Sequence, residues 1–122
     1  MNVECTRFKV KEGKSRVVDD WMELLNNRIE EVLLTLQDEK MYVETIFREV
    51  VDGDEYLYWY SVQGENGADV TDSQHEIDQL HLAYWEECID PNYGPVDLNA
   101  QVVMIPKYIR RSMGEPIEGG YL

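Results

Sequence analysis

Residues 40–63, KMYVETIFREVVDGDEYLYWYSVQ, decide the fold that the sequence predicts, because they contain two strand patterns around one turn. Residues 40–51 and 55–63 are rich in the β-branched and aromatic side chains that sheets favour. Between them, Asp52-Gly53 is a strong hairpin signal, because glycine tolerates a positive φ. The stretch therefore predicts an antiparallel hairpin.

The register of this hairpin depends on the length of its turn. A two-residue turn places Arg48 opposite Leu57 and Glu44 opposite Ser61, whereas a longer turn places tyrosines opposite the two charged residues. Because a shift of one residue moves every side chain to the other face of the sheet, the turn decides which aromatic residues line any pocket.

Four further elements flank the hairpin, and their order sets the fold class. The patterns predict a strand at residues 2–10, one long helix at 15–37 with Ser15 as its N-cap, a second helix from a capping box at Ser73–Glu76 to about Cys88, and a last strand at 99–105 stopped by Pro106. The order strand, helix, strand, strand, helix, strand is the ferredoxin-like βαββαβ arrangement. We therefore expect an α+β domain over residues 1–106, with a four-stranded antiparallel sheet and two helices on one face, followed by a C-terminal tail at 107–122.

The charge of the chain narrows the class of partner. Its 122 residues include 25 acidic and 11 basic ones, for a net charge of −14. Nucleic acids and anionic membrane surfaces both require clustered cations, so we expect neither as a partner. Between Arg48 and Lys107 there is no lysine or arginine, but there are 13 acidic residues. Such a surface either keeps the protein from aggregating or docks onto a basic protein, as an acidic interaction module.

Cysteine usage and the N-terminus predict a location. Cys5 and Cys88 form no CxxC pair, and residues 1–10 lack the apolar stretch of a signal peptide. No run approaches the roughly 18 apolar residues that a membrane-spanning helix needs. We therefore expect reduced thiols and a cytoplasmic protein.

Four stretches resemble a known superfamily. They are RFKVKEGK (7–14), MYVETIFREV (41–50), DGDEYLYWYSVQGENG (52–67) and HLAYWEECIDPNYGPVDL (81–98). Together with the element order, they resemble the dimeric α+β barrel proteins, including the antibiotic-biosynthesis-monooxygenase-like and NIPSNAP-like families, and a small bacterial family of unknown function. The resemblance implies two ferredoxin-like domains packed sheet to sheet. It does not choose a chemistry, because members include cofactor-free monooxygenases, haem-degrading enzymes, dehydratases, isomerases and ligand binders.

The residues predict a dimer independently of this resemblance. Helices on one face of the sheet leave the other face uncovered, and that face carries large aromatic and aliphatic side chains. Exposed apolar patches beyond a few hundred Å² usually mark interfaces. A self-complementary twofold contact covers such a face, so we expect a homodimer formed through the sheet.

His81 is the leading candidate for chemistry. It falls on the inward stripe of the second helix, where a histidine either acts as a general base near neutral pH or is a core residue held by a hydrogen bond. His75 lies six residues earlier, roughly 240° around the helix, so the two cannot bind one metal ion and His75 is expected in solvent.

Charged residues in the middle of strands are the second set of candidates. Arg7, Glu44 and Arg48 form either a salt-bridge network across the interface or a pocket for a polar ligand. Tyr58, Tyr60 and Trp85 would shape that pocket.

These observations leave three functions open. The first is a small ligand-binding or regulatory protein. The second is a cofactor-independent monooxygenase- or isomerase-like enzyme with His81 as base, although the first-strand asparagine of the monooxygenases has no counterpart inside this strand. The third is the acidic interaction module. No metal or cofactor is expected, since the sequence lacks a P-loop, a GxGxxG turn and an HExxH motif.

Overall fold

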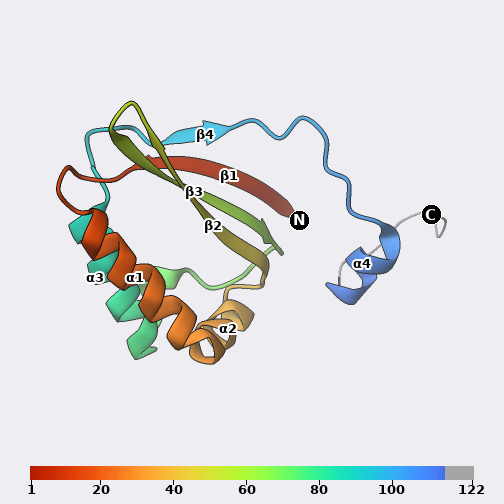
Figure 1. The fold of residues 1–122 in the computed structure, drawn as a ribbon. Coiled ribbons are helices and arrows are strands. Elements are labelled where there is room, and N and C mark those ends of the chain that lie inside the picture. The colour runs from red at the N-terminus through yellow and green to blue at the C-terminus, as the bar shows by residue number, and fades with distance from the viewer. Residues whose placement is uncertain (115–122) are drawn as a thin grey trace.

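The computed structural model describes residues 1–114 of the chain. Its sheet contains β1 (Asn2–Lys9), β2 (Met41–Val51), β3 (Asp54–Gln63) and β4 (Val96–Leu98) in the order β2-β3-β1-β4, with antiparallel neighbours (Figure 1). This order is that of the ferredoxin-like fold. The expected α+β class is therefore confirmed.

The hairpin between β2 and β3 has the two-residue turn. Asp52 and Gly53 adopt φ values of 51° and 83°, and Val51 pairs with Asp54. Arg48 consequently lies opposite Leu57, and Glu44 lies opposite Ser61. The shorter of the two registers is thus the correct one, and it turns Glu44 and Arg48 toward the helices.

The prediction of a single helix at 15–37 is wrong, because the chain leaves helical geometry at Arg28. Arg28 has φ −115° and ψ 34° and separates α1 (Ser15–Asn27) from α2 (Ile29–Asp38). Two asparagines of low helix propensity precede it. Its guanidinium donates to Glu31 at 2.6 and 2.7 Å and contacts Glu76 at 3.3 Å, which ties the break to α3 (Glu76–Cys88). The apolar stripe continues through the break, so periodicity alone could not locate it.

Both expected helix caps are also corrected. Lys14 occupies the N-cap of α1, and the Ser15 hydroxyl donates to Glu55 across the layers. His75 is the N-cap of α3 and has no side-chain cap bond, while Ser73 accepts the His75 backbone N–H at 3.1 Å in a local turn. In each case the serine hydroxyl binds a group other than the helix amide that it was expected to satisfy.

The prediction of a last strand at residues 99–105 is wrong, because the last strand lies earlier in the chain. β4 covers only Val96–Leu98, which pair with Arg7, Thr6 and Cys5 of β1. Residues 99–105 have no strand geometry. Their apolar run was the reason for the expected strand, but Val102, Val103 and Met104 are exposed. They lead to α4 (Lys107–Ser112), and we call residues 99–114 the C-terminal arm.

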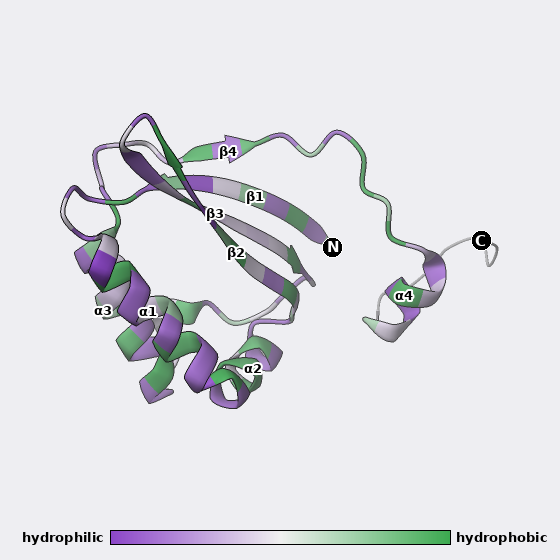
Figure 2. Ribbon diagram, viewed as in Figure 1, coloured by the Kyte–Doolittle hydropathy of each residue, from purple (hydrophilic) through white to green (hydrophobic). Residues whose placement is uncertain are grey.

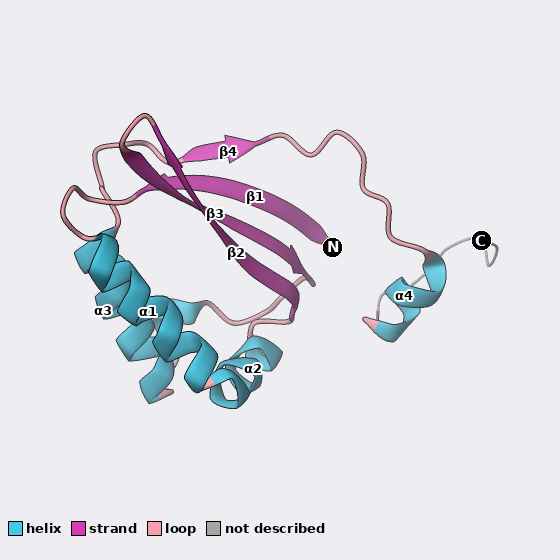
Figure 3. Cartoon of the chain, viewed as in Figure 1, coloured by secondary structure: helices cyan, strands magenta, loops and turns pink. Residues whose placement is uncertain are grey.

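The molecule has two layers and one uncovered sheet face. α1, α2 and α3 lie on one side of the sheet, and a short 3₁₀ turn, Val70–Asp72, precedes α3 (Figures 1 and 3). The core between the layers consists of Val10, Val18, Trp21, Leu57, Cys88 and Ile89. The C-terminal arm carries apolar stretches away from both layers (Figure 2). The tail expected at 107–122 is described only as far as residue 114, so its remainder lies outside the described residues. Within residues 1–114, no helix has the length and apolarity to span a membrane.

Candidate functional site

A cavity of about 690 Å³ lies between the helices and the sheet. We call it the sheet–helix cavity. β1, β2 and β3 form one wall, while α1, α2 and α3 form the others. Most of its lining is aliphatic or aromatic, with a smaller number of polar groups: Glu4, Thr6, Asn26, Thr35, Glu39, Glu44, Thr45, Ser61, Gln63, Asp69, Asp78 and His81. Its size and composition are those of a small-molecule site, for which volumes of roughly 300–1,000 Å³ are usual.

His81 is held in one orientation on the wall formed by α3. Its Nδ1 accepts a hydrogen bond from the indole Nε1–H of Trp21 at 3.0 Å, and Trp21 is 0% exposed. The ring centroids of Trp21 and Trp59 lie 5.5 and 5.6 Å from that of the imidazole. Burial lowers the pKa of His81 below its usual value, so the neutral ring prevails at pH 7.

The bond from Trp21 assigns the tautomer of that neutral ring. An indole nitrogen only donates, so the Nδ1 of His81 must carry the lone pair and Nε2 the proton. Within residues 1–114 the His81 side chain makes no other hydrogen bond. The group that it offers to a ligand is therefore a donor, and the expected role of His81 as a base does not fit this geometry.

Glu44 enters the same cavity from β2. Burial raises the pKa of its carboxyl group, and the neighbouring indole N–H of Trp59 acts in the opposite direction. Burial thus shifts both Glu44 and His81 toward their uncharged forms, one by raising a pKa and the other by lowering it. Two titratable groups shifted in this way within one cavity are a recognised feature of functional sites.

Two further carboxylates, Glu39 and Asp78, were not singled out from the sequence. Burial and the charges of nearby acidic residues, Glu44 first among them, raise the pKa of Glu39 to about 7. Asp78 is 6% exposed. It stands one turn before His81 on α3, so the three-residue spacing was the signal that could have found it. Within residues 1–114, no group of acidic, histidine or cysteine side chains has the arrangement of a metal site.

Trp21 was not singled out from the sequence as a site residue. A buried indole normally finds an acceptor for its N–H, and His81 was the histidine expected on an inward face. An inward tryptophan and an inward histidine on facing helices were therefore the signal in the sequence for the Trp21–His81 bond.

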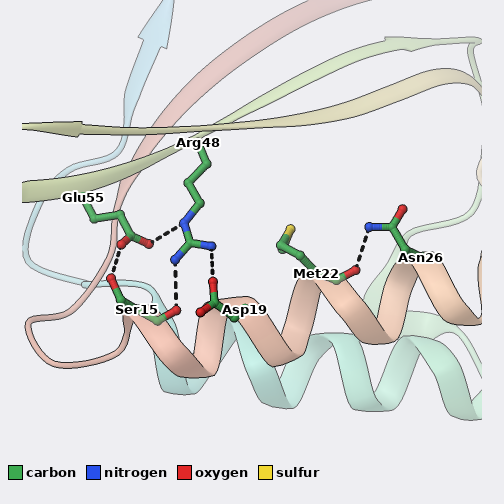
Figure 4. Close-up of polar contacts among 6 residues, drawn as sticks. All are labelled: Ser15, Asp19, Met22, Asn26, Arg48 and Glu55. Carbon is green, nitrogen blue, oxygen red and sulfur yellow. Dashed lines mark hydrogen bonds and ion pairs between the residues drawn. The ribbon is translucent and has the colours of Figure 1, made fainter.

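Arg48 lies on the helix side of the sheet but outside the cavity (Figure 4). It donates to Glu55 at 3.0 Å, to Asp19 at 2.6 Å and to the backbone oxygen of Ser15 at 2.9 Å. The Ser15 hydroxyl also donates to Glu55. The network joins β2 and β3 to the start of α1 within one chain, so Arg48 is a structural residue here rather than part of a pocket.

Arg7, Tyr58 and Tyr60 lie on the uncovered face of the sheet. Arg7 pairs with Tyr58 across β1 and β3, and its Nε donates to the hydroxyl of Tyr93 at 2.7 Å. The Arg7 guanidinium lies 5.7 Å from the ring centroid of Tyr56. Of the residues expected to form one pocket, the structure therefore brings together only three, Glu44, His81 and Trp85, and separates the others.

Residues 1–111 match the model of DUF6176, a family of unknown function. The chain belongs to this family. The DUF6176 protein is also similar in structure to the L-rhamnose mutarotase FA22100 from Formosa agariphila, with a TM-score of 0.51 and 15% sequence identity. The similarity covers 87% of this chain and 99% of the mutarotase chain, and at this identity it shows the fold. No curated protein matches the chain.

Proposed function

We propose that this protein binds a small molecule in the sheet–helix cavity. The observation that carries the proposal is the His81 ring. Trp21 fixes one of its nitrogens, and the other nitrogen, which has no hydrogen-bond partner within residues 1–114, belongs to the lining of the cavity. Sites for small molecules combine such an apolar lining with a few oriented polar groups. The mutarotase that shares the fold acts on a small molecule, which supports the same conclusion.

A pair of variants on adjacent residues of α2 tests this function. Leu33 and Leu34 are similarly exposed, at 51% and 58%, but only Leu33 lines the cavity. A panel of sugars, amines and carboxylic acids is screened by the change in Tm, and hits are measured by calorimetry. Leu33→Trp is expected to weaken binding of the hits at least tenfold because the larger side chain occupies the cavity, and Leu34→Trp is expected to leave binding unchanged. Equal effects of the two variants would place the ligand elsewhere.

A second candidate function is isomerisation by proton transfer, which the opposed shifts of Glu44 and His81 favour. In exchange of sugar anomers, Nε2–H of His81 would donate to the ring oxygen while the Glu44 carboxylate removes the anomeric hydroxyl proton. The ring C–O bond breaks, recloses on the other face, and both protons return. The rate of L-rhamnose anomer exchange, measured by NMR, is expected to fall to background in His81→Asn and to be unchanged in His75→Asn. Exchange no faster than background in the unmodified protein would exclude this candidate.

We also propose that two copies pair through the uncovered sheet face and the C-terminal arm. Phe47 is 55% exposed in the middle of β2, on the same face as Tyr58. In the arm, Val102 and Met104 are 70% and 84% exposed. Leu98 and the arm border a groove of about 240 Å³ beside β1 and Tyr60, and the groove is continuous with this face. The exposed apolar and aromatic side chains of the face and those of the arm can be buried against each other, so a second copy covers both by a twofold operation.

A further inference from the structure

The acidic residues that line the sheet–helix cavity have no basic counterparts in its lining. Five acidic side chains line it, at Glu4, Glu39, Glu44, Asp69 and Asp78, whereas no lysine or arginine is found among the described lining residues. Burial raises the pKa of Glu39 and Glu44, but any charge that the five groups carry is negative. A cavity with this field repels carboxylate and phosphate ligands and attracts cations.

Asp78 adds an unmet requirement for a hydrogen-bond donor. Its side chain lines the cavity, the residue is 6% exposed, and its Oδ2 is buried without a hydrogen-bond partner within residues 1–114. The position in the first turn of α3 offsets part of the cost, because a helix N-terminus favours negative charge. A buried acceptor without a donor still costs about 1–3 kcal/mol, and more when it is charged. A ligand with a positively charged N–H group supplies the missing donor.

Aromatic rings form the surface beside these carboxylates. Trp59 and Trp85 both line the cavity, with ring centroids 5.1 Å apart and planes at 69°. Tryptophan faces attract organic cations through the ring quadrupole. Aliphatic residues such as Leu25, Ile46 and Ile77 continue the lining and offer an apolar surface to the body of a ligand.

We propose that the ligand of this cavity is an organic cation, a small amine whose ammonium group binds Asp78, whose body packs on Trp59 and Trp85, and whose hydroxyl or carbonyl oxygen accepts from His81. This inference rests on the proposed small-molecule function and names its ligand class. A bare metal ion does not fit, because the acidic groups of residues 1–114 do not converge on one point. A neutral polyol uses the carboxylates as acceptors but leaves their charge uncompensated.

Three probes that differ only in the charge of one group test the class. Tyramine carries an ammonium group, 4-(2-hydroxyethyl)phenol is its neutral analogue, and 4-hydroxyphenylacetate is its anionic analogue. Calorimetry on the unmodified full chain is expected to show tyramine binding at least tenfold more tightly than the neutral analogue, with no measurable binding of the anion.

Variants then assign the effect to the carboxylates. Asp78→Asn is expected to reduce the tyramine preference at least tenfold, with Glu39→Gln acting in the same direction. Asp20→Asn, at an exposed position of α1 outside the cavity, is expected to retain the preference. Replacing a side chain whose Oδ2 has no hydrogen-bond partner within residues 1–114 should not unfold the protein, and unchanged or raised Tm values for Asp78→Asn verify this.

The outcomes distinguish failure of the organic-cation inference from failure of the proposed small-molecule function. If the neutral analogue or L-rhamnose binds as tightly as tyramine, the cation assignment is overturned and the small-molecule function stands. If tyramine is preferred but Asp78→Asn and Glu39→Gln leave the preference intact, the assignment to this cavity is overturned. If no compound in the panel binds, both proposals fail.

Discussion

Replacing Trp21 with alanine is expected to lower the free energy of unfolding by about 3–5 kcal/mol, the usual cost of removing a large aromatic side chain from a core. Trp21 is 0% exposed and packs beside Trp59, Tyr84 and Trp85, with ring centroids 5.6, 6.3 and 6.0 Å away. The substitution also leaves Nδ1 of His81 without its donor. Small domains have total stabilities of about 5–15 kcal/mol, so this loss is a large fraction of the whole.

Urea denaturation followed by circular dichroism measures the effect. Leu34→Ala is the control, because Leu34 is exposed on α2, and its change is expected to stay within about 0.5 kcal/mol. Trp21→Phe separates packing from hydrogen bonding, since it keeps a ring but removes the indole N–H. We expect it to weaken ligand binding more than its smaller loss of stability would suggest, because His81 loses its fixed tautomer. A loss below about 1 kcal/mol for Trp21→Ala would contradict the central place given to this residue.

Placing an aspartate at both Val102 and Met104 is expected to halve the mass of the particle in solution. The proposed dimer buries these two side chains, and two buried, unpaired carboxylates on each copy would cost far more than a contact of this kind supplies. Light scattering coupled to size-exclusion chromatography should give twice the chain mass of 14.3 kDa for the unmodified protein and 14.3 kDa for the double variant.

Leu34→Asp is the control for the dimer, because it charges an exposed apolar side chain, 58% exposed, on the helical side of the molecule. It is expected to leave the mass doubled. A single-chain mass for the unmodified protein at tens of micromolar would refute the pairing of the sheet faces. The expected docking of the acidic surface onto a basic protein is a separate prediction, and salt-independent behaviour would count against it.

The hairpin was predictable because its information is local. Asp52-Gly53 has the backbone freedom that a two-residue turn requires, and once the turn is fixed the pairing of Glu44 with Ser61 follows. The sheet order followed in turn from the sequence of elements and the handedness of their connections. These features need only neighbours in the chain and a general rule.

The predictions of the Ser15 cap and of one continuous first helix were wrong because residues distant in the sequence bind the side chains involved. The hydroxyl of Ser15 could cap its own helix, but Glu55 on β3 takes it. The helical stripe runs through Arg28, but the carboxylates of Glu31 and Glu76 hold that residue at a break. Such contacts become visible only when the layers are assembled.

The residues of the candidate site were likewise predictable only as far as local patterns reach. Alternation within each strand placed Glu44 and Arg48 on one face, and α3 placed His81 toward the sheet. Only the assembled structure shows that Arg48 binds Asp19 and Glu55, whereas Glu44 and His81 line the cavity. Whether Oδ2 of Asp78 finds a partner within residues 1–114 depends on every element around it, so no local pattern could have predicted that it has none there.

The most direct test of the small-molecule function follows the indole N–H signals of the chain's three tryptophans by NMR during separate titrations with tyramine and with L-rhamnose. Two of these residues, Trp59 and Trp85, line the sheet–helix cavity, while the Nε–H of Arg48 reports on an ion-pair network outside it. We predict that at least one compound shifts both tryptophan signals to saturation and leaves the Arg48 signal in place. Titrations in which neither compound moves the Trp59 and Trp85 signals, or in which only the signals of Arg7 and the uncovered face respond, would contradict it.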